Sequence, residues 1–250
     1  MEFNGSMFIS IHIPKTAGTA LSIIFDYGSG RRILYDYNIL RELEYFSGSY
    51  QIAYQDDVVD KFNHKDFIKK NFDFIHGHFW YEKYKDIFPN EKYITCLRDP
   101  LQRLISYYYH IVDGSDHVLE NMAEGLSLYA DLQSGKADIV DLATNKQLGN
   151  LQSTYLHGRD IKDYDHVFIN EKLAESVYQF QLIFDFERND PFMALDGVDS
   201  IPSFNVKSTR KIHRIEVAQH ALDEAKKLLS EDYELYRHAL EKFQAQSKNI

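Results

Sequence analysis

The stretch FISIHIPKTAGT, residues 8–19, decides the fold class of this chain. Its first half is an apolar alternation that predicts a strand over Phe8–Ile13, bounded by Pro14. A turn of small residues follows, and a helical pattern then runs from Thr19 to Tyr27. A strand, a turn and a helix in this order begin a β–α unit, and such units build parallel sheets.

Other short apolar or aromatic runs repeat this spacing along the chain. The predicted strands are Asp73–His76, Tyr93–Leu97, His166–Ile169 and Gln181–Phe184. The predicted helices are Leu101–Val112, His117–Leu132, Glu171–Phe180 and Glu216–Gln246, the last with a break near Ser230. We therefore expect an α/β, P-loop-like three-layer fold with a central parallel sheet flanked by helices and a helical C-terminal third.

The length and composition are those of a compact globular protein. The chain has 250 residues, of which 44% are hydrophobic and 26% charged. We expect one domain over residues 7–250, without internal repeats. The patterned sequence begins at Met7, so we interpret residues 1–6 as a candidate expression remnant.

The charge balance and the cysteine count exclude several classes of partner and site. Lys and Arg number 28 and Asp and Glu 38, a net charge of −10, which disfavours a broad nucleic-acid or anionic-membrane surface. No apolar run approaches the roughly 18 residues of a membrane helix. Cys96 is the only cysteine, which excludes an intrachain disulfide. Because the start of the chain also lacks an export signal, we expect a cytoplasmic location.

The turn after the first strand has the composition of an anion-binding loop. The N-terminus of the following helix offers N–H groups and a partial positive charge. Gly18 allows close backbone approach, Lys15 adds a charge, and Thr16 and Thr19 add hydroxyl donors. The lysine precedes the glycine, unlike the Walker A order, which disfavours a nucleotide kinase. The alternative is an ordinary β–turn–α connection with a solvated lysine.

A second strand-to-helix junction lies within Tyr93–His110. Pro100 suits a first helical turn, which places Arg98 at the carboxyl end of the strand and Ser106 about two turns into the helix. An arginine there can grip a phosphate in bidentate fashion, with the serine hydroxyl as a second donor. Arg103 has a weaker claim, since an arginine in a helix is usually exposed or snorkelling.

The two junctions together resemble the sulfotransferases that use 3′-phosphoadenosine 5′-phosphosulfate (PAPS), in the carbohydrate branch that contains the heparan sulfate 2-O-sulfotransferases. Pro14–Thr19 is similar to the loop that holds the 5′-phosphosulfate in that family, and Arg98 through Ser106 to the segment that holds the 3′-phosphate. Weaker similarity runs from Met7 to roughly Phe243. The resemblance implies that the cofactor-binding residues include Lys15, Thr16, Ala17, Gly18, Thr19, Arg98 and Ser106.

Between the two junctions lies Phe74–Phe79, which contains His76-Gly77-His78 at the end of a predicted strand. The family resemblance implies that a histidine here is the catalytic base, by position His78, with His76 as an auxiliary. An imidazole suits this role because its ordinary pKa near 6.5 lets it accept a hydroxyl proton near neutral pH. The alternatives are structural histidines or a zinc site, and the lack of an obvious third and fourth ligand disfavours zinc.

A basic, hydroxyl-rich segment lies in the polar stretch Gly197–Lys211, for which we predict a long loop. It falls near the point where the related enzymes close over the nucleotide. The resemblance implies contacts from Lys207, Ser208, Thr209 and Lys211 to the 3′-phosphate or adenine. An ordinary solvated loop before the C-terminal helix is an equal alternative.

These features predict an enzyme that transfers a sulfuryl group in line from PAPS to an acceptor hydroxyl, releasing adenosine 3′,5′-bisphosphate. We expect a saccharide or glycoconjugate acceptor and no metal, with His78 as base and Lys15 neutralising charge on the leaving phosphate oxygen. Two alternatives are a P-loop-like phosphotransferase, which would need a divalent metal, and a non-catalytic nucleotide-binding protein. The presence of both His78 and Lys15 favours the enzyme.

Overall fold

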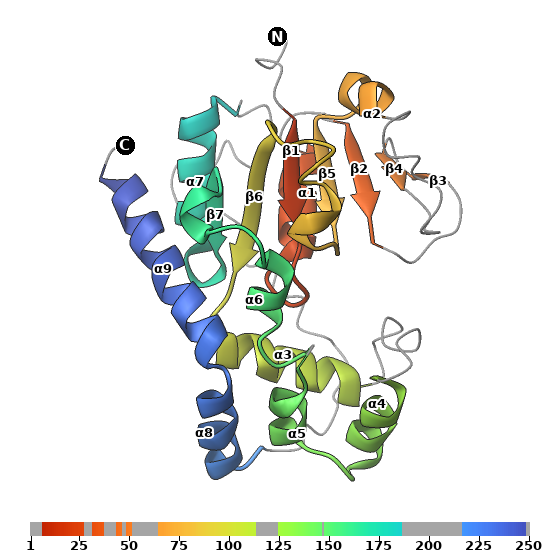
Figure 1. Ribbon diagram of the computed structural model, residues 1–250, viewed down its shortest axis with the longest axis vertical. Helices are drawn as coiled ribbons and strands as arrows, with labels where there is room; N and C mark the ends of the chain where they lie inside the picture. The colour runs from red at the N-terminus through yellow and green to blue at the C-terminus, as the bar shows by residue number, and fades with distance from the viewer. Residues whose placement is uncertain are drawn as a thin grey trace. The chain divides into compact units, whose positions relative to one another are not determined.

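The computed structural model describes residues 7–27, 32–37, 44–46, 49–51, 65–113, 125–146, 148–186 and 217–248 (Figure 1). The chain divides into two compact units. The sheet unit comprises Met1–Leu97, Tyr155–Pro202 and His238–Ile250, and the helical unit comprises Arg98–Thr154 and Ser203–Arg237. Each unit combines separated stretches of the chain, and the expectation of one domain over residues 7–250 stays a prediction.

The sheet unit is built on seven strands in the order β3-β4-β2-β5-β1-β6-β7, labelled in Figure 1. Every neighbouring pair is parallel except β3 with β4. The strands are β1 (Phe8–Ile11), β2 (Ile33–Asp36), β3 (Glu44–Phe46), β4 (Ser49–Gln51), β5 (Phe74–Gly77), β6 (Lys92–Leu97) and β7 (His166–Ile169). The expected α/β three-layer fold, a central parallel sheet flanked by helices, is thereby confirmed.

One face of the sheet is covered by α1 (Gly18–Tyr27) and α7 (Leu173–Phe184). Phe8 of β1 stacks on Phe74 of β5 with ring centroids 5.0 Å apart. Phe25 of α1 lies 4.6 Å from Phe74, and Phe180 of α7 lies 5.3 Å from Phe8. Aromatic side chains bury large areas, so this cluster fixes both helices against the strands.

The strand expected at Gln181–Phe184 is wrong, because these residues are the end of α7. The short apolar run could not by itself distinguish a strand from a buried helix segment. Val177, Phe180 and Phe184 recur at helical spacing and all belong to the same core cluster. The 3.6-residue period therefore prevails over the local strand propensity.

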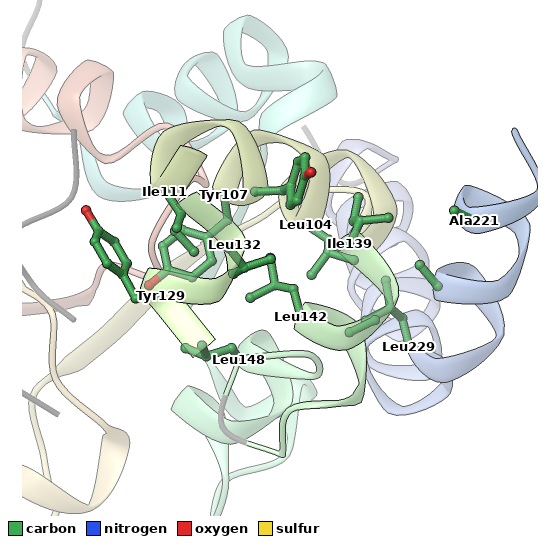
Figure 2. Packing of buried hydrophobic residues seen from close by; sticks show 13 residues of the cluster. Leu104, Tyr107, Ile111, Tyr129, Leu132, Ile139, Leu142, Leu148, Ala221 and Leu229 are labelled. Carbon is green, nitrogen blue, oxygen red and sulfur yellow. The ribbon is translucent and has the colours of Figure 1, made fainter. Parts of the chain in front are cut away.

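Several helices of the helical unit pack around one apolar cluster, shown in Figure 2. Helix α3 (Pro100–Val112) contributes Leu104, Tyr107 and Ile111, which lie on one helix face. Leu142, from another helix, and Leu229, which lies between the last two helices, also belong to the cluster. The remaining helices are α4 (Gly125–Ser134), α5 (Ile139–Thr144), α6 (Leu151–Leu156), whose last residues belong to the sheet unit, and α8 (Gln219–Leu228).

The C-terminal helical prediction is confirmed, including its break. Helix α8 ends at Leu228 and α9 (Ser230–Ser247) begins two residues later. The helix predicted at His117–Leu132 is described from Gly125 onward, where α4 begins; its first part lies outside the described residues. The sequence did not predict β2, β3, β4 or the short helices α2 (Lys65–Asn71), α5 and α6. Single 3₁₀ turns occupy Tyr81–Lys83, Ile161–Asp163 and Asn170–Lys172.

Candidate active site

The loop between β1 and α1 has an unusual backbone. Lys15 and Ala17 have φ angles of 71° and 69°, in the left-handed region that disfavours side chains with a Cβ atom. Thr16 lies between them and is buried, and its hydroxyl and N–H donate to the carbonyl oxygen of Ile13 at 2.8 and 3.3 Å. Turns of this kind direct main-chain N–H groups to one side and form concavities that bind anions.

Gly18 begins α1 and packs directly on a histidine ring. A Cβ atom at this position would lie 1.7 Å from Cε1 and Nε2 of His12. No side chain fits there unless the ring moves. Glycine therefore lets the helix start against His12, which follows β1 in the chain.

Three histidines come together near the carboxyl ends of β1 and β5: His76 lies within β5, and His12 and His78 each follow a strand. In the parallel pairing of these strands Ser10 lies opposite His76. The rings of His12 and His76 stack with centroids 5.2 Å apart and an interplanar angle of 7°, and the ring of His78 lies 4.3 Å from that of His12. We call His12, His76 and His78 the histidine stack.

The hydrogen bonds of the stack define the tautomer of His78. Its Nδ1 lies 2.7 Å from the carbonyl oxygen of His12. Because a carbonyl oxygen only accepts, Nδ1 carries the hydrogen, and in the neutral ring Nε2 then carries the lone pair. Nδ1 of His76 lies 2.8 Å from the hydroxyl of Ser10, and Nδ1 of His12 lies 3.2 Å from the hydroxyl of Tyr37.

Two members of the stack are held neutral. Burial lowers the pKa of His76 to about 3; repulsion from His78 adds to this shift and the backbone of Gly18 opposes it. Burial also lowers the pKa of His12 well below its ordinary value, with further repulsion from His78, His76 and Lys15. His76 is fully buried, whereas His78 is partly exposed. His78 is therefore the member best placed to exchange a proton with a ligand, and the Lys15 ammonium lies within electrostatic reach of the stack.

Gly77, the last residue of β5, lies between His76 and His78, and β2 approaches it closely. A Cβ atom there would lie 1.8 Å from the carbonyl oxygen of Asp36. The buried Asp36 carboxylate pairs with Lys83 at 2.5 Å and accepts a hydrogen bond from the hydroxyl of Tyr84 at 2.8 Å. These contacts connect the end of β2 to the segment that follows His78.

The second expected junction has the predicted local structure. Arg98 follows the last residue of β6, and α3 begins at Pro100. The side chain of Asp99 caps the helix by accepting from the N–H of Gln102 at 2.9 Å. Ser106 lies in the second turn of α3 and is partly exposed.

Arg103 is completely buried within the helical unit. Its Nη2 donates to the carbonyl oxygens of Leu148 and Gly149 at 2.9 and 2.6 Å, and its Nε lies 3.9 Å from Asp232. The side chain is therefore neither exposed nor snorkelling, and it binds main-chain oxygens just before α6 (Leu151–Leu156).

Sequence reasoning missed His12, Tyr37 and Gln152. The available signal for His12 was the alternation that places Ser10 and His12 on the same face of the first strand. Because β1 and β5 are parallel neighbours, with Ser10 opposite His76, this face lies beside the histidines that follow Ile75. Nothing in the local sequence marked Gln152. The predicted contacts of Lys207, Ser208, Thr209 and Lys211 lie outside the described residues.

Neither a metal cluster nor a membrane helix is found in the part of the chain that the structure describes. There, no group of three or more His, Cys, Asp and Glu side chains is arranged to hold a metal ion. None of the described helices is both long and apolar enough to cross a membrane.

Comparison with known proteins identifies the family. No curated protein matches the chain. A solved structure, that of a sulfotransferase from Alicyclobacillus acidocaldarius, is similar with a TM-score of 0.47 and 14% sequence identity, over 92% of this chain and 93% of that chain. The model of the sulfotransferase family matches residues 5–239, which is most of the sequence. The chain belongs to the sulfotransferase family.

Proposed function

We propose that the protein transfers a sulfuryl group from PAPS to a hydroxyl of a carbohydrate acceptor, with His78 as the general base. The observation that carries this proposal is the 2.7 Å hydrogen bond from Nδ1 of His78 to the carbonyl oxygen of His12. It supports a neutral ring whose Nε2 carries the lone pair and whose orientation is held by the main chain that follows β1. A carbohydrate acceptor is argued from the branch of the family that the two motifs resemble.

The stack is suited to taking up a single proton. Since His12 and His76 stay neutral, the proton that His78 accepts from an acceptor hydroxyl meets no second imidazolium. Lys15 supplies the nearby positive charge, which we assign to the developing charge on the leaving phosphate oxygen. The bound donor supplies the sulfuryl group, and the residues of the stack and the loop orient the reactants.

The β1–α1 loop fits the phosphosulfate end of the donor. Its left-handed residues and its lysine favour an anion, and α1 begins directly behind it. Both donors of Thr16 are used by Ile13, so we assign Thr16 to the turn of the loop. The anion contacts are assigned to Lys15, to Thr19 and to the main chain of Ala17 and Gly18.

In the helical unit, Arg98 and Ser106 are proposed to bind the 3′-phosphate. The contacts expected of Lys207, Ser208, Thr209 and Lys211 remain part of the proposal, as do a metal-free reaction and a cytoplasmic location. The fixed main chain of Arg98, described below, supports its assignment, since a phosphate ligand benefits from a backbone that does not move.

Calorimetric titration with adenosine 3′,5′-bisphosphate, beside ATP with magnesium, tests the donor. We expect the wild-type protein to bind the bisphosphate, and Arg98→Ala and Lys15→Ala each to weaken that binding. If the protein binds ATP with magnesium but does not bind adenosine 3′,5′-bisphosphate, the proposal is overturned in favour of a phosphotransferase. An acceptor screen with PAPS, read by release of the bisphosphate, then tests whether saccharides are the substrates.

A further inference from the structure

The main chain of Arg98 is held by one side chain at both of its polar groups. The N–H of Arg98 donates to Oε1 of Gln152 at 2.9 Å, and Nε2 of Gln152 donates to the carbonyl oxygen of Arg98 at 3.0 Å. Gln152 is fully buried. Its amide therefore acts as a two-point clamp on a residue that follows β6 and precedes the cap of α3.

Gln152 is itself fixed through its own main chain. The carboxylate of Asp232 accepts from the N–H of Gln152 at 3.2 Å, and from the N–H and hydroxyl of Ser153 at 2.7 and 2.8 Å. Asp232 thus caps the first turn of α6 from the first turn of α9. Gln152, whose side chain holds Arg98, is therefore itself held in place at the N-terminal turn of α6.

A buried charge completes the arrangement. Burial raises the pKa of Asp232, and the Arg103 guanidinium and the donors of Ser153 and Gln152 oppose that rise. Both carboxylate oxygens accept hydrogen bonds, as suits the ionised form. Arg103 also binds the carbonyl oxygens of Leu148 and Gly149, just before α6.

A buried ion pair of this kind contributes little net stability over apolar packing, because desolvation offsets the Coulomb attraction. The Arg103–Asp232 pair instead fixes the position of the start of α6, the helix that contains Gln152. Glutamine fits the clamp because its amide has both a donor and an acceptor, whereas a carboxylate or an apolar chain of similar length lacks one or both.

We infer that Gln152 is a positioning residue for the 3′-phosphate site, holding the main chain of Arg98 so that its guanidinium meets the phosphate in a fixed geometry. This inference rests on the proposed function. Gln152 acts through Arg98, and the Arg103–Asp232 pair acts through Gln152.

The test compares two nucleotides in the full-length protein. Adenosine 3′,5′-bisphosphate carries the 3′-phosphate and adenosine 5′-monophosphate does not. We expect Gln152→Met to weaken binding of the bisphosphate about tenfold, the loss of about one net hydrogen bond, and to leave binding of the monophosphate unchanged. In an Arg98→Ala background the same substitution should have no further effect on the bisphosphate.

Gln133→Met is the matched control. Gln133 also lies in the helical unit and donates one side-chain hydrogen bond, to the carbonyl oxygen of Ile111 at 3.3 Å. Its loss should not change the preference for the bisphosphate. Should Gln152→Met not fold, Gln152→Glu preserves length and one acceptor but cannot donate to the Arg98 carbonyl, and should weaken the bisphosphate in the same selective way.

The outcomes separate this inference from the proposed function. A wild-type protein that does not prefer the bisphosphate, or whose preference is unchanged in Arg98→Ala, would overturn both. A preference that depends on Arg98 but survives both Gln152 substitutions would overturn the positioning role alone. Equal weakening of both nucleotides, or additive loss in the double variant, would also overturn it, because that is the result of general destabilisation.

Discussion

The two units bury polar side chains in opposite ways. In the sheet unit His12 and His76 are held neutral by burial and by repulsion from neighbouring positive charge. In the helical unit Arg103 and Asp232 are both fully buried as a charged pair; Arg103 donates hydrogen bonds to main-chain carbonyl oxygens, and Asp232 accepts them from main-chain N–H groups. Burial disfavours the charged form in both cases, and only the second supplies an opposite charge to offset it.

The difference matches what each unit is proposed to do. A general base must change its protonation state during each turnover, which a ring with neutral neighbours does readily. A phosphate ligand must keep its position, which a network of charged hydrogen bonds favours. The buried charges of the helical unit therefore fix the position of the main chain. In the sheet unit, the neutral rings of His12 and His76 allow His78 to take up a proton without repulsion from a second imidazolium.

The largest expected effect follows from removing the base. His78→Ala should lower turnover about 10² to 10⁴-fold, the usual contribution of general-base catalysis, while calorimetric binding of adenosine 3′,5′-bisphosphate stays near wild type. His157→Ala is the matched control, since His157 is an exposed histidine of the sheet unit whose ring contacts Glu82. Unchanged turnover in His78→Ala, or an equal loss of nucleotide affinity, would contradict the role of base.

Crowding the stack without removing a histidine should have a smaller effect. The methyl group of Gly18→Ala would lie 1.7 Å from the His12 ring, so the ring or the helix must shift. We expect a loss of about 1–3 kcal/mol in the free energy of unfolding, measured by urea titration, together with reduced turnover. At Gly135, with φ of 71° and nothing within 4 Å of the added Cβ, alanine should cost stability by strain alone and leave turnover unchanged. Normal turnover in Gly18→Ala would mean that the packing of the histidine stack is not needed for catalysis.

The smallest expected effect is on the pH dependence of stability. Nε2 of His166 lies 3.0 Å from the carbonyl oxygen of Ser176, and burial lowers its pKa to about 3. Its pKa in an unfolded chain is near 6.5, so between these values the unfolded state binds more protons and stability falls as the pH is lowered.

His166→Gln removes this proton uptake and retains an amide donor for Ser176. Urea titrations between pH 6.5 and 4 should show a slope shallower by up to about 1.4 kcal/mol per pH unit. An unaltered slope would mean that His166 is not held neutral by its burial, and would weaken the same argument for His76.

Local patterns predicted much of the architecture. The β1–α1 and β6–α3 junctions, β7 and the break between α8 and α9 follow from hydrophobic periodicity, a proline at a helix start and short polar turns. Where the local signal is weak, as in the short run at the end of α7, the prediction was wrong because only packing on the sheet reveals the helical stripe.

The sequence alone determined the residue types and order of the two candidate anion loops and the position of His78, because each lies within one continuous motif. Only the tertiary structure decided that the carbonyl of His12 orients His78, across 66 positions, and that Gln152 clamps Arg98, across 54. Strand pairing and helix packing create these contacts, and no local pattern encodes them. A short motif can identify the reacting group. The neighbours that set its tautomer, charge and position come from distant parts of the chain.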